Sequence, residues 1–222
     1  MTLQSAHKKA LEPFEIAFES APRVRADLDW LERLREQAWH TVQSVGLPHR
    51  RVEAWKYTDL AAWFAKHAYQ PAPASDGPVL AEAVEQPALA AFEAIDAYRL
   101  VFANGRLRAD LSKLDGLPDG VDLLPLKEAL SRAEARELME EAAVVDAQAE
   151  QAVALNTALM ADGYALFLAA GAVLDKPLHV VFVGSEGARH TRHLIHLGEG
   201  ASATILESHI GAGEADAFGD TV

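Results

Sequence analysis

Histidine is concentrated near the carboxyl end of the chain, and its spacing suggests chemistry more readily than that of any other residue type. Five of the nine histidines fall within the last 44 residues. Imidazoles on neighbouring strands can bind a divalent metal, and Glu207 lies close to His209 as a further ligand type. The sequence therefore allows a cupin-like metal-binding enzyme built on His179, His190, His193, His196 and His209.

The spacing of these histidines nevertheless argues against a shared metal site. His190, His193 and His196 are three residues apart, and side chains on a strand alternate between its two faces. His190 and His196 would then share one face, with His193 on the other. We therefore interpret the histidines as exposed to solvent or satisfied within a core, and we assign no metal ligand.

A second candidate is the charged and aromatic stretch of residues 50–58. Arg50, Arg51 and Lys56 could clamp an anion. Alternatively, Trp55 and Tyr57 anchor a loop between two helices, while Arg51 and Glu53 cap a helix or form ion pairs. We favour the structural interpretation, because no glycine-rich phosphate cradle lies nearby.

Motifs of the common enzyme classes are absent from the sequence. It contains no Gly-x-Ser-x-Gly, P-loop or His-Glu-x-x-His pattern. Acidic residues are plentiful, but spacing singles out no pair for acid–base catalysis. We therefore assign no catalytic and no cofactor-binding residue.

Composition narrows the classes of partner. The 33 acidic and 20 basic residues give a formal charge of −13, which argues against binding to nucleic acid or to an anionic membrane. No apolar run is long enough for a transmembrane helix, and the first residues lack a secretory signal. The absence of cysteine excludes disulfides and thiolate ligands from this chain. We expect a cytoplasmic protein.

The elements that would position these residues are helical in the first part of the chain. Apolar spacing predicts an amphipathic helix over residues 25–45, ended by Gly46 and Pro48. A short helix is expected over residues 60–67, with Thr58 or Asp59 as its N-cap. Residues 70–78 predict a loop, and residues 81–94 a helix broken at Pro87.

The rest of the chain alternates between β and helical patterns. Asn104-Gly105 predicts a type I′ hairpin within residues 98–108. Residues 121–124 predict a strand, and residues 125–158 are largely helical in pattern. From Gly163 the pattern becomes short apolar runs separated by turn residues, typical of a sandwich, barrel or solenoid. These runs are residues 164–168, 178–183, 193–197 and 203–209.

Four blocks, taken in order, resemble the SufB/SufD family of iron–sulfur cluster assembly proteins, and its SufD branch in particular. The first block is the most specific, and together they cover nearly the whole chain from about residue 25. They are residues 46–48 with 51–60, residues 102–105 with 111–112, residues 154–158 with 162–163 and 174–178, and residues 190–210.

The resemblance implies an α+β fold in two parts. Residues 1–162 would form a mostly helical N-terminal domain with a small β-hairpin region. Residues 163–222 would form the first rungs of a right-handed parallel β-helix, truncated at Val222. An open strand edge would remain there, through which the chain could self-associate.

The resemblance also implies a role and partners, and it leads us to expect that the chain is not an enzyme. The chain would belong to a SufBCD-type scaffold, pairing with a SufB-like paralogue and with a SufC-like ABC ATPase whose docking region lies beyond Val222. It would hold no cofactor itself, and the iron–sulfur cluster, together with flavin, would belong to the complex. Because clusters are held chiefly by thiolates, these would come from the partner. A β-solenoid interaction module without any link to metals is the remaining alternative.

Overall fold

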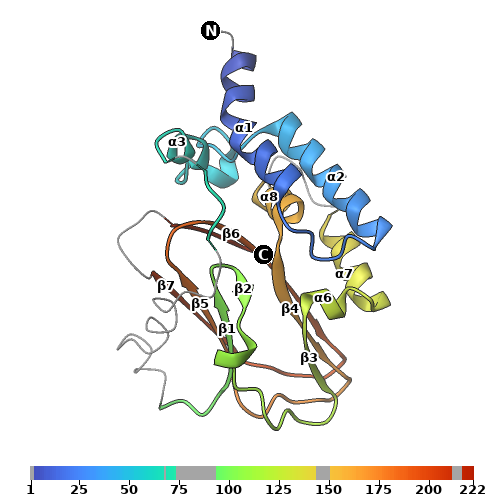
Figure 1. Ribbon diagram of the computed structural model, residues 1–222. Helices are drawn as coiled ribbons and strands as arrows, with labels where there is room; N and C mark the ends of the chain where they lie inside the picture. Colours follow the sequence, from blue (N-terminus) through green and yellow to red (C-terminus); the bar gives the residue numbers. More distant parts are fainter. Residues whose placement is uncertain (1–2, 68, 74–93, 144–150, 212–216) are drawn as a thin grey trace.

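The fold was determined as a computed structural model, which describes residues 3–67, 69–73, 94–143, 151–211 and 217–222 (Figure 1). A layer of helices lies at one end of two β-sheets. The helices among these residues are α1 (Leu3–Ser20), α2 (Asp29–Val45), α3 (Leu60–Phe64), α6 (Leu126–Ala129), α7 (Ala133–Ala142) and α8 (Gln151–Leu159). The strands are β1 (Tyr98–Ala103), β2 (Arg106–Leu107), β3 (Val121–Pro125), β4 (Asp162–Leu168), β5 (Leu178–Gly184), β6 (Gly187–Leu197), β7 (Ile205–Gly211) and β8 (Ala217–Thr221).

Each sheet has four strands and mixed direction. One sheet has the order β2-β1-β5-β7 and the other β3-β4-β6-β8. In each, three strands run parallel, and the strand at one edge, β2 or β3, runs antiparallel to its neighbour. The described residues therefore form a small α/β fold with two mixed sheets and six α-helices.

The expectation of an α+β fold with the first rungs of a right-handed parallel β-helix is wrong. Strands before residue 162 enter both sheets, with β1 parallel to β5 and β3 antiparallel to β4. The apolar runs after Gly163 thus pair with β1 and β3 as well as with one another. The sequence pattern predicted the later strands but carried no information on these partners.

The interior between the two sheets is apolar and aromatic. Alternate residues of the central strands point into it, including Phe102 of β1, Tyr164 and Leu166 of β4, and Val180 and Phe182 of β5. All of these are at most 2% exposed. This packing holds the sheets face to face, as in a sandwich.

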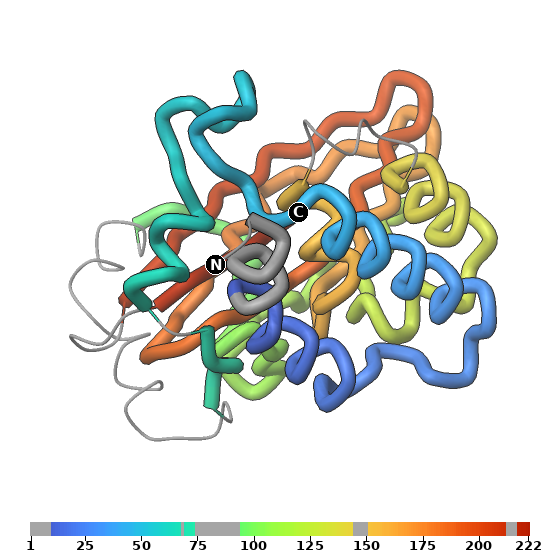
Figure 2. Tube along the Cα trace, turned by 90° about the horizontal axis from the view of Figure 1, so that it is seen from above, coloured from blue at the N-terminus to red at the C-terminus, as the bar shows by residue number. Residues whose placement is uncertain are grey.

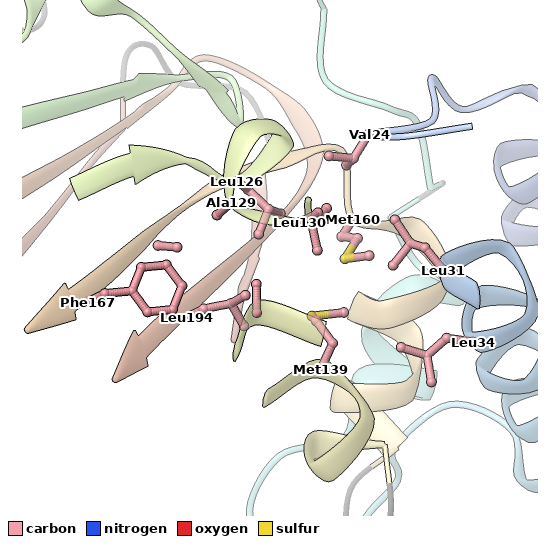
Figure 3. Packing of buried hydrophobic residues seen from close by; sticks show 12 residues of the cluster. Val24, Leu31, Leu34, Leu126, Ala129, Leu130, Met139, Met160, Phe167 and Leu194 are labelled. Atoms are coloured by element: carbon pink, nitrogen blue, oxygen red, sulfur yellow. The ribbon is translucent and has the colours of Figure 1, made fainter. Parts of the chain in front are cut away.

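The outer face of the second sheet, which has the order β3-β4-β6-β8, is covered by helices. Phe167 and Leu194 pack against Leu126 and Met139, which come from α6 and α7 (Figure 3). Leu31 of α2 belongs to the same cluster. Because β4 is buried on both faces, its sequence is a continuous apolar run rather than an alternating one.

Several local predictions are confirmed. The long helix is α2, which begins at Asp29 rather than residue 25 and stops before Gly46, whose φ is 82°. Of the two proposed N-caps, Asp59 is the one used, since its carboxylate accepts a hydrogen bond from the Ala62 N–H at 2.8 Å. Asn104 and Gly105 have φ of 48° and 74°, as a type I′ turn requires.

Other local predictions differ from the structure or lie outside it. α3 ends at Phe64, and the helical stretch after residue 125 divides into α6, α7 and α8. β6 begins at Gly187, earlier than expected, while α1 and β8 were not predicted. The helix expected over residues 81–94 and the end of the 70–78 loop fall outside the described residues, Ala94 excepted. Within the described part of the chain, no helix combines the length and apolarity that a membrane crossing requires.

α2 is attached to α8 through a buried arginine. Arg35 is 1% exposed, and its guanidinium donates to the Ala158 carbonyl through Nε at 3.1 Å and Nη2 at 2.8 Å. Its Nη1 lies 3.2 Å from Glu32. The Ala158 carbonyl, in the last turn of α8, thereby gains a cationic partner, which a helix C-terminus favours.

Arg35→Ala should therefore destabilise the fold by about 3 kcal/mol, because it leaves a buried carbonyl unpaired and removes charge-assisted hydrogen bonds. Arg33→Ala, on the exposed face of the same helix, should change the free energy of unfolding by no more than about 0.5 kcal/mol. Urea denaturation of both variants measures the difference. Equal stabilities of the two variants would contradict the role given to Arg35.

Candidate functional site

A buried network of polar side chains joins α8 to β6 and β8. Asn156 is fully buried, and its Nδ2 donates to the backbone carbonyls of Thr191 and Asp220, both at 2.9 Å. Its Oδ1 accepts from Arg192 Nε at 2.9 Å. One amide therefore binds two strands and a buried cation, so the end of the sheet and α8 are held in one register.

Arg192 is the second member of this network. It is 2% exposed, and its guanidinium also donates to Thr157 Oγ1 and to the Val153 carbonyl of α8. Burial lowers the pKa of Arg192 to about 10, and the charge of Asp220 acts in the opposite direction. The side chain still carries its charge at neutral pH, and the described network gives it neutral oxygens as hydrogen-bond partners.

Beside this network, a tyrosine, a histidine and an aspartate are linked by a chain of hydrogen bonds. Tyr69 Oη lies 3.1 Å from His190 Nε2, and His190 Nδ1 lies 2.8 Å from Asp220 Oδ2. Burial, together with the charge of Asp220, raises the pKa of Tyr69. The phenol therefore keeps its proton. In the neutral Nδ1–H tautomer of His190, the phenol O–H donates a hydrogen bond to Nε2 and Nδ1–H donates one to the carboxylate.

Residues 69–73 are placed by backbone pairing with β6. The Ala188 N–H donates to the Gln70 carbonyl at 2.7 Å, and the Ala72 N–H donates to the Ala188 carbonyl at 2.8 Å. Tyr69 also contacts Phe14 of α1, with ring centroids 4.2 Å apart. The Tyr69–His190–Asp220 chain thus connects this segment, the helical layer and the second sheet.

A cavity of about 460 Å³ lies next to the Tyr69–His190–Asp220 hydrogen-bond chain. Its walls include Tyr69 and His190, together with Arg106 and Arg189. The Arg106 guanidinium donates to the Ala161 carbonyl at 2.5 Å. The phenol, imidazole and carboxylate resemble a proton relay in their order, but both imidazole nitrogens are already engaged, and the raised pKa of Tyr69 disfavours a phenolate nucleophile.

The structure separates the five C-terminal histidines that the sequence singled out. His190 and His196 do lie on the opposite face of β6 from His193, which packs between the sheets. His179 lies 2.9 Å from Ser208 Oγ, and His209 lies 3.4 Å from Glu207. Among the described residues, no group of three or more histidines and carboxylates is placed to hold a metal ion.

His193 has the most unusual surroundings of these histidines. Its ring stacks on Tyr164 with centroids 4.3 Å apart, and it also lies 5.6 Å from Phe102 and 5.4 Å from Phe182. The Tyr164 N–H donates to His193 Nδ1 at 3.3 Å, whereas His193 Nε2 and the Tyr164 hydroxyl are buried without a partner in the described structure. The interior between the sheets therefore holds two buried polar atoms that lack a hydrogen-bond partner within the described residues.

The cationic stretch between α2 and α3 is largely exposed. Tyr57 is 92% exposed, so the prediction that it anchors the loop is wrong, while Trp55 is partly buried. Lys56 pairs with Glu53 at 2.6 Å, and Arg50 lies 3.9 Å from Asp59. Arg51 neither caps nor pairs through its side chain within the described residues.

Sequence reasoning missed the Tyr69–His190–Asp220 chain and the Asn156–Arg192 pair. One signal was available, because Asn156 and Thr157 interrupt an otherwise apolar helix and must be satisfied when buried. The partners of this asparagine lie 35 and 64 residues away. That separation put them beyond any local pattern.

The interior position of His193 predicts a pH dependence of stability. Burial, reinforced by the charges of Arg192 and His209, lowers the pKa of His193 from 6.5 to about 3. The unfolded chain therefore binds this proton at a higher pH than the folded chain does. Stability should fall as the pH is lowered from about 6.5 to about 3, with a slope of up to about 1.4 kcal/mol per pH unit from this residue.

Urea denaturation between pH 7 and pH 4 tests this expectation. His193→Gln should reduce the slope, whereas His196→Gln, at an exposed position on the same strand, should leave it unchanged. The change in slope is the readout, because His193→Gln also alters packing. Identical slopes in the two variants would show that His193 does not cause the dependence.

Comparison with known proteins places the chain in a family. Residues 23–180 match the family described as the SufBD protein N-terminal region. A search of the curated proteins found no match. The matched stretch is well over half of the chain and contains α2, α8 and the strands from β1 to β4, including Asn156. The chain therefore belongs to the SufBD family and contains its N-terminal region.

Proposed function

We propose that this chain is a non-enzymatic scaffold component of a SufBCD-type complex, in which it pairs with a SufB-like paralogue and with a SufC-like ABC ATPase. Membership of the SufBD family supports a role in iron–sulfur cluster assembly of the Suf type. This family match is the single observation that carries the proposal. The complex, rather than this chain alone, would couple ATP hydrolysis to cluster assembly.

The cluster would be cargo and product for this chain rather than a resident cofactor. The sequence contains no cysteine, and iron–sulfur clusters are held chiefly by cysteine thiolates. The thiolates would therefore come from the paralogue, and flavin, where it takes part, would bind at the level of the complex. The chain itself would supply position and rigidity.

The geometry of the sheets supports a scaffolding role. The two sheets are joined by an aromatic interior, and α8 ties the helical layer to β6 and β8. β7 and β8 end their sheets, and within the described residues no strand pairs with their outer edges. Such edges present backbone donors and acceptors to another strand. The outer edges of β7 and β8 would pair with strands of another protein, and the packed sheets would hold these edges rigid.

Affinity purification of the protein from its native cells tests this function. The protein produced from its own gene, with a tag, should bring down an ABC ATPase and a cysteine-containing paralogue, identified by mass spectrometry. The 222-residue chain, purified in parallel, tests whether the ATPase depends on a further segment. Recovery of neither protein with either form would overturn the assignment to a SufBCD-type complex.

The open edges also lead us to expect self-association of the isolated 222-residue chain. Light scattering over a range of concentrations should show a mass that rises above that of the 24.0 kDa monomer. Edge strands of this kind template pairing with a second copy unless they are covered. A constant monomer mass at high concentration would contradict this expectation.

A further inference from the structure

The segment between α2 and α3, residues 49–59, exposes cationic and aromatic side chains together. We refer to it as the basic loop. It runs out from the body of the molecule (Figure 2), and Arg50, Arg51, Lys56 and Tyr57 are all exposed. Among the described residues, Tyr57 at 92% is far more exposed than Ile16, the next large apolar side chain at 60%.

The charge of the basic loop is opposite to that of the whole chain. The chain carries −13, whereas the loop has three cations, Arg50, Arg51 and Lys56, against the two carboxylates of Glu53 and Asp59. A positive patch of this kind on an acidic protein selects negatively charged partners at close range.

Arg51 is the cation of the loop that lacks a charged partner within the described residues, and Arg50 is held only loosely. Lys56 is engaged by Glu53 at 2.6 Å. Asp59 uses one oxygen to cap α3, and its other oxygen lies 3.9 Å from Arg50 Nε, at the limit of an ion pair. No ion pair or hydrogen bond of the Arg51 guanidinium is formed with any described residue. A depression of about 310 Å³, lined in part by Arg50 and Arg51, lies beside them.

Tyr57 supplies a large, exposed aromatic side chain on the same loop. The Lys56 ammonium lies 5.2 Å from the centre of its ring, so the ring stays beside the charged groups rather than folding into the core. Tyrosine and arginine are the residue types that most often dominate the energy of protein interfaces. The basic loop therefore carries an exposed tyrosine and two exposed arginines, which are residue types typical of an interface centre.

We propose that the basic loop is a docking surface for an acidic segment of a protein partner. Carboxylates of that segment would bind Arg50 and Arg51, whose planar guanidiniums suit two-point recognition of a carboxylate. An apolar side chain of the same segment would cover the ring of Tyr57. A nucleic acid fits less well, because the net charge of the chain repels a phosphate backbone.

Photo-cross-linking in native cells tests the contact directly. Benzoylphenylalanine replaces Tyr57 in the protein expressed from its own gene, and the control variant carries it at His40, an exposed position on α2. Position 57 should give a product with a protein segment rich in Asp or Glu, and position 40 should not. Products with nucleic acid, with segments lacking acidic residues, or with the chain itself alone would overturn the proposal.

Charge reversal tests the electrostatic part of the contact. Arg50→Glu combined with Arg51→Glu should weaken binding of the purified cross-linked partner by about tenfold at low salt, and by less at high salt. Arg33→Glu is the matched control, an exposed arginine on α2. Changing the contacted carboxylates of the partner to Lys should restore binding to the double variant. Equal affinities of the double variant and the control would overturn the role of the two arginines.

The proposal does not depend on the SufBCD assignment. If the ATPase and the paralogue co-purify but position 57 gives no intermolecular product, the docking surface is wrong and the proposed function stands. If position 57 captures an acidic segment of some other protein, and neither Suf partner is recovered, the docking surface stands and the proposed function fails.

Discussion

The arrangement of the molecule depends on the hydrogen bonds that α8 makes to elements far from it in sequence. Arg35 of α2 binds the carbonyl of Ala158, and Asn156 binds the backbone of β6 and β8 while accepting from Arg192. Each of these groups is buried, so an unmade bond would be costly. The helical layer and the second sheet therefore keep one relative placement.

This placement is reinforced by the Tyr69–His190–Asp220 chain, which links residues 69–73 to β6 and β8. Networks of this kind define a unique packing only when every member is satisfied. Most of the polar atoms at the α8 junction meet this condition. The interior between the sheets does not, since the Tyr164 hydroxyl and His193 Nε2 are buried without partners. The polar atoms at the α8 junction are therefore more fully hydrogen-bonded than those between the sheets.

Function in this family is tied to assembly, and the structure offers surfaces of two kinds. The outer edges of β7 and β8 present backbone groups, whereas the basic loop presents Arg50, Arg51 and Tyr57. The first kind suits pairing of strands with little dependence on side chains, and the second selects a partner by charge and shape. In the function proposed here, a scaffold without thiolates of its own would need such contacts to reach the chain that holds the cluster.

The sequence by itself determined several local elements and the family. The Asn104-Gly105 turn, the stop at Gly46 and the cap at Asp59 follow from local backbone chemistry, and they were predictable because each involves residues a few positions apart. The apolar runs after Gly163 were likewise recognisable as strands. Only the tertiary structure decided the partners of those strands, because pairing of β1 with β5 joins segments about 80 residues apart. It also decided that Tyr57 is exposed and that His190 meets Tyr69 and Asp220, since burial and contact depend on which distant segments pack together.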